Sequence, residues 1–419
     1  MKYDLERRRG FFFQITKDNT DFKRSLFLRY IKKRKSLFML YRLTERLKNG
    51  FFGPIAGLSF YLITYLLIRF PQNRKCVSML RLKTEKKSYR DIFGKNCNGI
   101  NLMRLSLLIS YSSIKSLVRQ FSFKKIIHAL HILGIILKRY DLFIALRSIQ
   151  YLAYYDRFDF EIDKRNTNMI IIFTDANPHG RALMQLAHKK DIGLCFISHG
   201  EPNEPIPPVY CDIVYLLGER SLLRYKKSKS RFGKVLYHGH KNIFKRIREV
   251  EFRKNVRIGI FLSKSTGLDE VVKLNYLLEE TFRCESILIR EHPNMGLSKK
   301  EKNRLLENPK IQISDGKSID RDIEKCDLIF AGNSTVHVDI LLRGCPSLYY
   351  RGLEKTFFDR YGYIKEGVVL DWNIDIIPDD INNFYKDLNN KNRISYYLNT
   401  DKDSQESIKE INEIVFKYI

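Results

Sequence analysis

The chain has 419 residues and a formal net charge of +28, so it is long enough for two or three domains with cores of their own. Its seven cysteines are scattered and include no C-x-x-C pair, which argues against a disulfide framework or a zinc site and is typical of a reducing cytoplasm. The first residues do not follow a signal-peptide pattern, so we do not expect secretion.

Positive charge is concentrated in the first 165 residues. They hold 35 Lys and Arg against 12 Asp and Glu, a net of +23, whereas the remainder holds 40 against 35. The run Arg24–Lys48 interleaves Leu, Phe, Tyr and Met with Lys and Arg, as amphipathic helices on a lipid surface do. This region therefore has two open interpretations: binding to an anionic membrane surface, or a helical core with a solvated basic face.

An uncharged run of eighteen residues, Phe51–Ile68, follows this basic stretch. Its length makes it a marginal candidate for a transmembrane helix. Gly53 and Pro54 near its start shorten any continuous helix, so the sequence favours a buried or half-inserted helix over a membrane span.

Apolar residues keep a helical spacing to about residue 160, and short β-rich runs begin near residue 166. We therefore predict an α/β protein in three parts. Residues 1–165 form a basic, mainly helical region, residues 166–250 a first Rossmann-like lobe, and residues 251–419 a second Rossmann-like lobe with a terminal helix. A cleft is expected between the lobes.

Short apolar runs predict the strands of both lobes, and most are followed by a plausible helix, as in βα units of a parallel sheet. The predicted strands are Met169–Thr174, Leu194–Ser198, Ile213–Leu217 and Val235–Tyr237, then Arg257–Leu262, Ile287–Arg290, Ile311–Ser314, Leu328–Ala331, Ser347–Tyr350 and Val368–Leu370. Ligands of open α/β sheets bind beyond the carboxyl ends of the strands, so residues that follow these runs are the site candidates.

In the first lobe, His199 follows a strand and precedes a proline-rich loop. Its imidazole can act as a general base, with Glu201 orienting the ring, or it can simply fix the loop by hydrogen bonds. Asp175, Asn177 and His179 end an earlier strand and are candidates for contact with acceptor hydroxyls. His179 is the rival base, and Asp175 is counted with His199 as a catalytic candidate.

In the second lobe, Arg290 and His292 end a strand in the string REHP, where a guanidinium and an imidazole can hold phosphate oxygens. The sharpest local signal is the string AGNSTVHVDILLRG. In it, Asn333, Ser334 and Thr335 can cap a helix whose free amides would face a phosphate, or form an ordinary cap. Ser263 and Lys264 lie in a second candidate phosphate loop. No metal-binding aspartate pair is evident, so we expect neither a metal nor another cofactor.

Residues 166–400 resemble the GT-B superfamily of nucleotide-sugar-dependent transferases, in particular bacterial enzymes of capsule, lipopolysaccharide and teichoic-acid assembly. The resemblance rests on the strings SHGEP, YLLGERSLLRY, REHPN, AGNSTVHVDILLRGCPSLYY and FFDRYGYIKEGVV. In CDP-glycerol glycerophosphotransferases and capsule Kdo transferases, an HG loop, an HP turn and a Ser/Thr-led helix occur in this order. The resemblance implies that His199 is the base, His292 contacts the donor phosphate, and Ser334 and Thr335 begin the phosphate-binding helix.

The resemblance implies a metal-independent glycosyltransferase that moves a sugar from a nucleotide-sugar donor to a glycan or lipid-linked acceptor at the inner face of the cell membrane. The rival activity is CDP-polyol phosphate transfer, although Glu201 replaces the residue usual after the HG pair in that family. A nucleic-acid-binding protein is a second alternative, which the long apolar runs near the N-terminus disfavour. A non-catalytic scaffold with this fold is the third.

Overall fold

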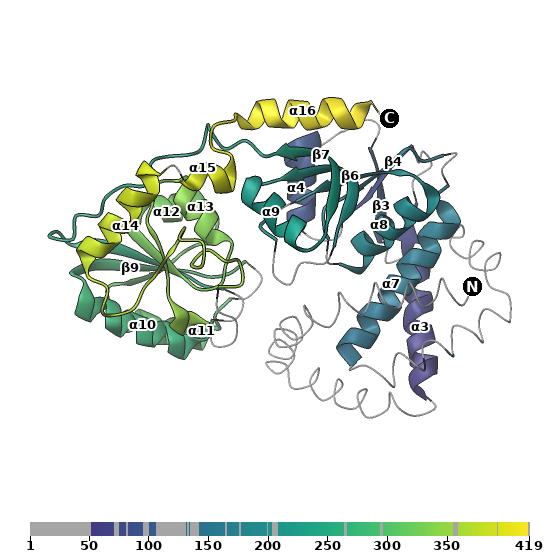
Figure 1. The fold of residues 1–419 in the computed structure, drawn as a ribbon. Coiled ribbons are helices and arrows are strands. Elements are labelled where there is room, and N and C mark those ends of the chain that lie inside the picture. Colours follow the sequence, from purple (N-terminus) through teal and green to yellow (C-terminus); the bar gives the residue numbers. More distant parts are fainter. Residues whose placement is uncertain are drawn as a thin grey trace.

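The described part of the chain forms two lobes, each built around its own sheet (Figure 1). The computed structural model describes residues 52–70, 75–80, 83–94, 100–105, 131, 134, 142–163, 166–175, 177–198, 200–202, 208–263, 266–293, 296–354, 359–391 and 393–417. The string Arg24–Lys48 lies outside these residues.

The first sheet has the strand order β1-β3-β2-β4-β5-β6-β7. Neighbouring strands are parallel except for β1 and β3, which pair antiparallel at one edge. Two of its central strands, β2 and β4, are buried along their whole length, which is the environment in which continuous runs such as MIII form parallel sheets. The strands are β1 (Ile68–Arg69), β2 (Cys76–Met79), β3 (Ile100–Leu105), β4 (Met169–Ile172), β5 (Gly193–Ile197), β6 (Tyr210–Leu216) and β7 (Arg231–Tyr237).

The predicted boundary at residue 166 is corrected by this sheet. Three of its strands, β1, β2 and β3, come from the region that the sequence analysis assigned to a mainly helical N-terminal part. The physical reason is their length: apolar runs of two to six residues carry too few positions for periodicity to separate a buried strand from a buried helix. The first lobe therefore extends upstream of residue 166.

Helices cover both faces of the first sheet. They are α3 (Phe52–Leu66), α4 (Lys83–Phe93), α7 (Leu142–Glu161), α8 (Pro178–Lys190) and α9 (Glu219–Lys227). No helix in the described part of the chain combines the length and apolarity needed to cross a bilayer. Helix α8 begins with Pro178, whose fixed φ suits a first helical position, and ends at Asp191 in the left-handed conformation with a φ of 55°. This sharp start and stop place the residues after β4 at the carboxyl end of the sheet.

The second sheet is parallel throughout, with the order β10-β9-β8-β11-β12-β13. Numbered from its own first strand, this is 3-2-1-4-5-6, the doubly wound order. Strands are added toward one edge from β8 to β10 and toward the other edge from β11 on, so the switch point lies between β8 and β11. Ligands of such sheets bind outside the carboxyl ends of the two strands at that switch point. The strands are β8 (Val256–Phe261), β9 (Cys284–Arg290), β10 (Ile311–Ile313), β11 (Leu328–Ala331), β12 (Ser347–Tyr349) and β13 (Leu370–Asp371).

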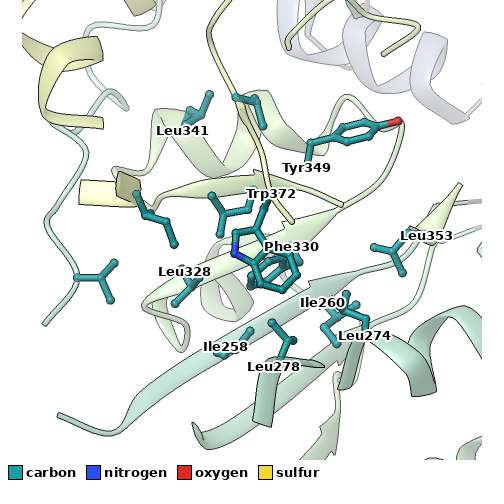
Figure 2. Packing of buried hydrophobic residues seen from close by; sticks show 14 of the residues in the cluster. Ile258, Ile260, Leu274, Leu278, Leu328, Phe330, Leu341, Tyr349, Leu353 and Trp372 are labelled. Carbon is teal, nitrogen blue, oxygen red and sulfur yellow. The ribbon is translucent and has the colours of Figure 1, made fainter. Parts of the chain in front are cut away.

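A continuous apolar core joins this sheet to its helices. Trp372, which is 1% exposed, packs edge-on against Phe330 with ring centroids 5.0 Å apart (Figure 2). Leu274 and Leu278 of α10 lie in the same cluster. The surrounding helices are α10 (Leu268–Thr281), α11 (Lys299–Leu306), α12 (Ile319–Glu324), α13 (Val336–Leu342), the 3₁₀ turn η1 (Arg351–Leu353), α14 (Pro378–Asn390) and α15 (Arg393–Leu398).

The last helix, α16 (Ser404–Phe416), returns to the first lobe, above which it lies in Figure 1. Its Ile411 and Val415 are buried in the first lobe's core together with Cys76 and Tyr89. The sequence analysis counted this helix with residues 251–419, and only the tertiary contacts show that it completes the other lobe.

The fold class is confirmed: two consecutive α/β lobes follow one another in the chain. All four strands predicted between residues 166 and 250 are present, and so are the six predicted in the second lobe, although β13 lies two residues later than expected. Among the described residues, no helix separates β5 from β6, in keeping with the prolines that follow β5.

Candidate functional site

Polar residues from three segments meet at the switch point of the second sheet. Ser263, two residues after β8, donates its hydroxyl to the Glu354 carboxylate, which follows η1. Gly332, directly after β11, lies against the same glutamate, and a Cβ at this position would be 2.7 Å from Glu354 Cγ. A larger residue at position 332 would collide with the Glu354 side chain, so glycine allows Glu354 to lie directly against the turn after β11.

A buried histidine fixes the turn after β11. His337 of α13 is fully buried, with Nε2 2.9 Å from the Gly332 carbonyl oxygen and Nδ1 2.7 Å from the Ser347 hydroxyl. Burial lowers the pKa of His337 to about 4, so the ring is neutral at neutral pH. In that form Nε2 donates to the carbonyl and Nδ1 accepts from the hydroxyl. The sequence analysis quoted the string that contains His337 but gave this residue no role.

The three residues predicted to bind phosphate follow Gly332 and are each half-buried. The Asn333 side chain accepts a hydrogen bond of 2.9 Å from the Arg360 amide, and the Ser334 hydroxyl accepts one of 3.3 Å from the Val336 amide. Thr335 holds the N-cap position of α13 without a capping bond from its side chain. Asn333 therefore links this turn to the loop around Arg360, while Ser334 binds the first amide of α13.

Arg290 is anchored inside the second lobe. Its guanidinium forms an ion pair with Asp322 of α12 and donates to the Ser318 and Gly316 carbonyl oxygens, each at 3.3 Å. The structure thus places Arg290 beside the β10–α12 loop, with part of its charge already compensated by a carboxylate. It supports that loop, which differs from the direct grip on phosphate that the sequence suggested. His292, two residues later, is half-buried.

Asp339 of α13 faces the first lobe. Its carboxylate is close enough to Lys87 of α4 for the two charges to interact, and it is 3.6 Å from Arg343. The side chain is 47% exposed, yet the surrounding protein raises its pKa above the usual value, and Arg343 and Lys87 oppose that rise. The structure places Asp339 on the side of the second lobe that approaches α4.

A cavity of about 650 Å³ lies between η1 and the start of α10, and Glu354 is one of its lining residues. This volume is in the range of small-molecule sites. Charged side chains of both signs and one tyrosine dominate its lining: Asp269, Glu270, Lys273, Arg304, Tyr350, Arg351 and Glu354. Glu354 thus belongs both to the switch point and to this cavity.

In the first lobe, Asp175 and Asn177 lie beyond the carboxyl end of β4, as predicted. Asp175 accepts a hydrogen bond of 2.8 Å from the Tyr225 hydroxyl of α9, and burial raises the pKa of that tyrosine, so it remains a donor. The Asn177 side chain accepts from Arg147 of α7 at 3.4 Å. Both residues are half-buried and linked to neighbouring helices.

His179 occupies a different environment from the one expected. It is 2% exposed, lies 3.5 Å from the Glu85 carboxylate and packs edge-on against Tyr154. A side chain enclosed between α4, α7 and α8 lies inside the lobe, so we correct its predicted contact with an acceptor hydroxyl. The reason is the helical start at Pro178, which turns the next residue inward.

Glu201 is also buried, at 5% exposure, and has a structural partner. Arg220 of α9 donates to it at 2.9 Å, and Ser221 does so at 3.2 Å. Burial raises the pKa of the Glu201 carboxyl, while Arg220 and Arg224 pull it down. The predicted acceptor contact of Glu201 is therefore corrected to an internal ion pair. His199 and Lys264 lie outside the described residues.

Arg220 joins the two lobes. Beyond Glu201, it bonds Glu366 at 2.7 Å and the Tyr361 carbonyl, both in the second lobe. Its guanidinium lies 5.1 Å from the ring centroids of Tyr363 and Tyr397. Arg224 donates to the same loop, at the carbonyls of residues 360 and 361. Because the Arg360 amide binds Asn333, one loop contacts both the α9 arginines and the turn after β11.

No protein-family model and no curated protein matches this chain. Among solved structures, S. aureus MnaA with UDP is 10% identical and aligns over 82% of this chain and 96% of its own, with a TM-score of 0.46. CalG4, the calicheamicin glycosyltransferase, is 9% identical over 83% and 98%, with a TM-score of 0.45. MurG of Acinetobacter baumannii is 10% identical over 82% and 99%, with a TM-score of 0.42. Scores below 0.5 carry no functional argument, so function is argued from the site itself.

Sequence reasoning found the turn after β11 and the ends of β4, β8 and β9, but it missed Glu354 and Arg220. Glu354 follows a 3₁₀ turn, and no motif distinguishes it in the sequence. Arg220 stands in the string YLLGERSLLRY, which carried part of the resemblance without an assigned role. In the described part of the chain, no group of three His, Cys, Asp or Glu side chains is placed to hold a metal ion.

Proposed function

We propose that this chain is a glycosyltransferase of GT-B type that uses a nucleotide-sugar donor. The observation that carries the proposal is the meeting of Ser263, Glu354 and the Gly332–Thr335 turn at the switch point of a doubly wound sheet. Residues at this position in such sheets contact phosphate and ribose of bound nucleotides. The turn is fixed by His337, so its geometry is set before a ligand arrives.

The donor's phosphates are assigned to Ser334 and Thr335, with His292 as a further donor of hydrogen bonds. Arg290 acts as a positioning residue, because Asp322 already holds its guanidinium. Asp339 is assigned to the hydroxyls of the nucleoside, since its carboxylate is partly exposed next to this turn. Backbone amides and His292 then stabilise the charge that develops on the leaving phosphate.

The acceptor belongs to the first lobe in this proposal. His199 takes the proton from the acceptor hydroxyl as that oxygen attacks the anomeric carbon, and the nucleoside phosphate leaves with the bonding electrons. Asp175 supports the acceptor side from the end of β4. We further propose a glycan or lipid-linked acceptor of capsule or lipopolysaccharide assembly, reached at the inner face of the cell membrane.

The first test is binding of CMP, CDP, UDP and GDP to the purified chain, followed by thermal unfolding. Ser334→Ala and Asp339→Asn are the site variants, and His188→Ala in α8 is a control outside the site. We expect one nucleotide to raise the melting temperature of the wild-type and control proteins, and both site variants to lose most of that rise. A protein that none of the four stabilises would contradict the donor site.

Turnover separates the two transferase chemistries. Release of a nucleoside diphosphate or monophosphate from a nucleotide sugar, dependent on a glycan acceptor, supports the proposal. Release of CMP from CDP-glycerol or CDP-ribitol, with nucleotide sugars inert, would replace it by polyol-phosphate transfer at the same site.

A further inference from the structure

Arg220 is enclosed by aromatic rings and carboxylates that belong to both lobes. Its side chain is 1% exposed, and its guanidinium lies 5.1 Å from the ring centroids of Tyr363 and Tyr397. It donates to Glu201 of the first lobe at 2.9 Å and to Glu366 of the second lobe at 2.7 Å. A guanidinium carries its N–H donors in a planar fork, so this one side chain holds partners on both lobes in a fixed geometry.

One row of buried contacts leads from Arg220 to the turn after β11. The Tyr363 ring, which the guanidinium faces, meets the His337 ring edge-on with the two centroids 5.8 Å apart. His337 in turn donates from Nε2 to the Gly332 carbonyl oxygen at 2.9 Å. Arg220, Tyr363 and His337 are each at most 2% exposed. A close-packed interior has little free space to absorb a shift, so a displacement of one member of this row displaces the next.

A second connection runs through the backbone of the loop 359–366. The two arginines of α9 donate to the carbonyls of Arg360 and Tyr361, and the Arg360 amide donates to the Asn333 side chain at 2.9 Å. The Asp359 carboxylate stiffens the loop, because it accepts two of the loop's own amides at 3.1 and 2.8 Å. The loop therefore binds the first lobe through its carbonyls and the turn after β11 through an amide.

At its first-lobe end, this network holds the segment that follows β5. Glu201 is 5% exposed and accepts hydrogen bonds from Arg220 and Ser221. Next to it, the Gly200 carbonyl accepts a bond of 2.6 Å from the hydroxyl of Ser198, the residue directly after β5. Ligands of open α/β sheets bind beyond the carboxyl ends of the strands. The network thus connects such an edge of the first sheet with the switch point of the second.

We propose that Arg220 is a positioning residue that couples the donor turn, Gly332–Thr335, to the segment after β5 on the acceptor side. Occupation of the donor turn restrains the acceptor side through Tyr363 and the loop 359–366, and Arg220 itself touches neither substrate. The words donor and acceptor rest on the proposed function. The coupling between the two segments is reciprocal, so it can also be measured without a ligand.

The first test is hydrogen exchange of the full chain, followed by mass spectrometry without a ligand. Asn333→Ala disconnects the loop from the donor turn and should speed amide exchange in α9 roughly twofold to tenfold, the effect of losing about one hydrogen bond. Asn382→Ala is the matched control. The Asn382 side chain also binds backbone, the amide and carbonyl of Val250 at 2.9 and 3.0 Å, but it lies outside this network, so α9 should exchange as in wild type.

Arg220→Lys is the variant that interrupts the coupling. It keeps a positive charge beside Glu201, but an ammonium lacks the planar fork that holds both lobes. In this background, Asn333→Ala should change exchange in α9 less than twofold. If circular dichroism shows that Arg220→Lys is unfolded, Tyr363→Leu takes its place, since it breaks the row of rings and leaves the Glu201 ion pair intact.

The second test adds the nucleotide that stabilises the wild-type chain. In wild type, it should slow exchange both in the turn after β11 and in α9, whereas in Arg220→Lys it should slow exchange in the turn alone. An arginine with a merely structural role would alter exchange in α9 equally with and without nucleotide.

The proposal is overturned if Asn333→Ala leaves exchange in α9 unchanged, or if Arg220→Lys transmits the effect of Asn333→Ala or of the nucleotide in full. If no nucleotide binds the wild-type chain, the proposed donor site fails, and the ligand-free comparison still decides whether Arg220 couples the two segments.

Discussion

Replacement of Arg220 by methionine should destabilise the protein by a pH-dependent amount. The arginine side chain is 1% exposed, and so is its partner, the Glu201 carboxylate, in a pair 2.9 Å apart. Removing one member of a buried pair leaves the other charge uncompensated, at a cost of about 3–5 kcal/mol. Glu366, the second partner, is 30% exposed and can be solvated, so most of the cost falls on Glu201.

The upper limit of that cost can be worked out from protonation. An ordinary glutamate titrates near pH 4.5. Holding it neutral costs about 1.4 kcal/mol per pH unit above that value, hence about 3.4 kcal/mol at pH 7 and about 1.4 kcal/mol at pH 5.5. In the variant, the folded-state pKa of Glu201 is raised above its unfolded value, so stability is lost as pH rises. The destabilisation should therefore shrink by about 2 kcal/mol between pH 7 and pH 5.5.

Urea unfolding followed by the fluorescence of Trp372 and by circular dichroism measures this effect. Arg220→Met/Glu201→Gln should recover most of the loss, because glutamine cannot be left as an ion. Arg257→Met is the control: its ion pair with Asp327 is partly exposed, and the cost should stay below about 1 kcal/mol. A loss that does not change between pH 7 and pH 5.5, or that Glu201→Gln fails to restore, would refute the buried-charge argument.

Three further predictions concern the site and its surroundings. Burial lowers the pKa of His238, His240 and His337 to about 3, 4 and 4, below the ordinary 6.5. Their contribution to the free energy of unfolding is then fully present above pH 6.5 and falls as pH drops, by up to about 1.4 kcal/mol per pH unit for each histidine. Urea unfolding midpoints at pH 7 and pH 5.5 would reveal this loss, and an unchanged midpoint would contradict it. Gly332→Ala should displace Glu354, because the new Cβ would lie 2.7 Å from Glu354 Cγ. Titration calorimetry should then show nucleotide binding that is weaker by at least about tenfold, and equal affinity would show that the contact is irrelevant. His337→Phe should cost about 2–4 kcal/mol in urea unfolding, since the Gly332 carbonyl and the Ser347 hydroxyl lose a buried partner, and a loss under 1 kcal/mol would exclude that role.

The local pattern of the chain was enough to predict the strands of both lobes downstream of residue 166. Runs such as LIFA are short, apolar and followed by turn residues, and these properties are set by neighbours in sequence. The same holds for the turn after β11, where glycine and three small polar residues precede a helix. A terminal helix was likewise predicted, although the sequence did not indicate which lobe it packs against.

Tertiary structure decided which polar residues share a site and which are enclosed. His179 and Glu201 follow strands, as site residues do. However, the start of α8 turns His179 inward, and Glu201 forms a buried ion pair with Arg220. Glu354 reaches Ser263 from 91 residues away, and Arg220 reaches Glu366 from 146 away. Sequence periodicity describes one element at a time, whereas such contacts depend on how strands from distant parts of the chain are ordered in a sheet. The net charge, the strand pattern and the apolar run of α3 could thus be predicted from the sequence. The contacts that join the two lobes and the order of the strands could not, because they depend on residues far apart in the chain.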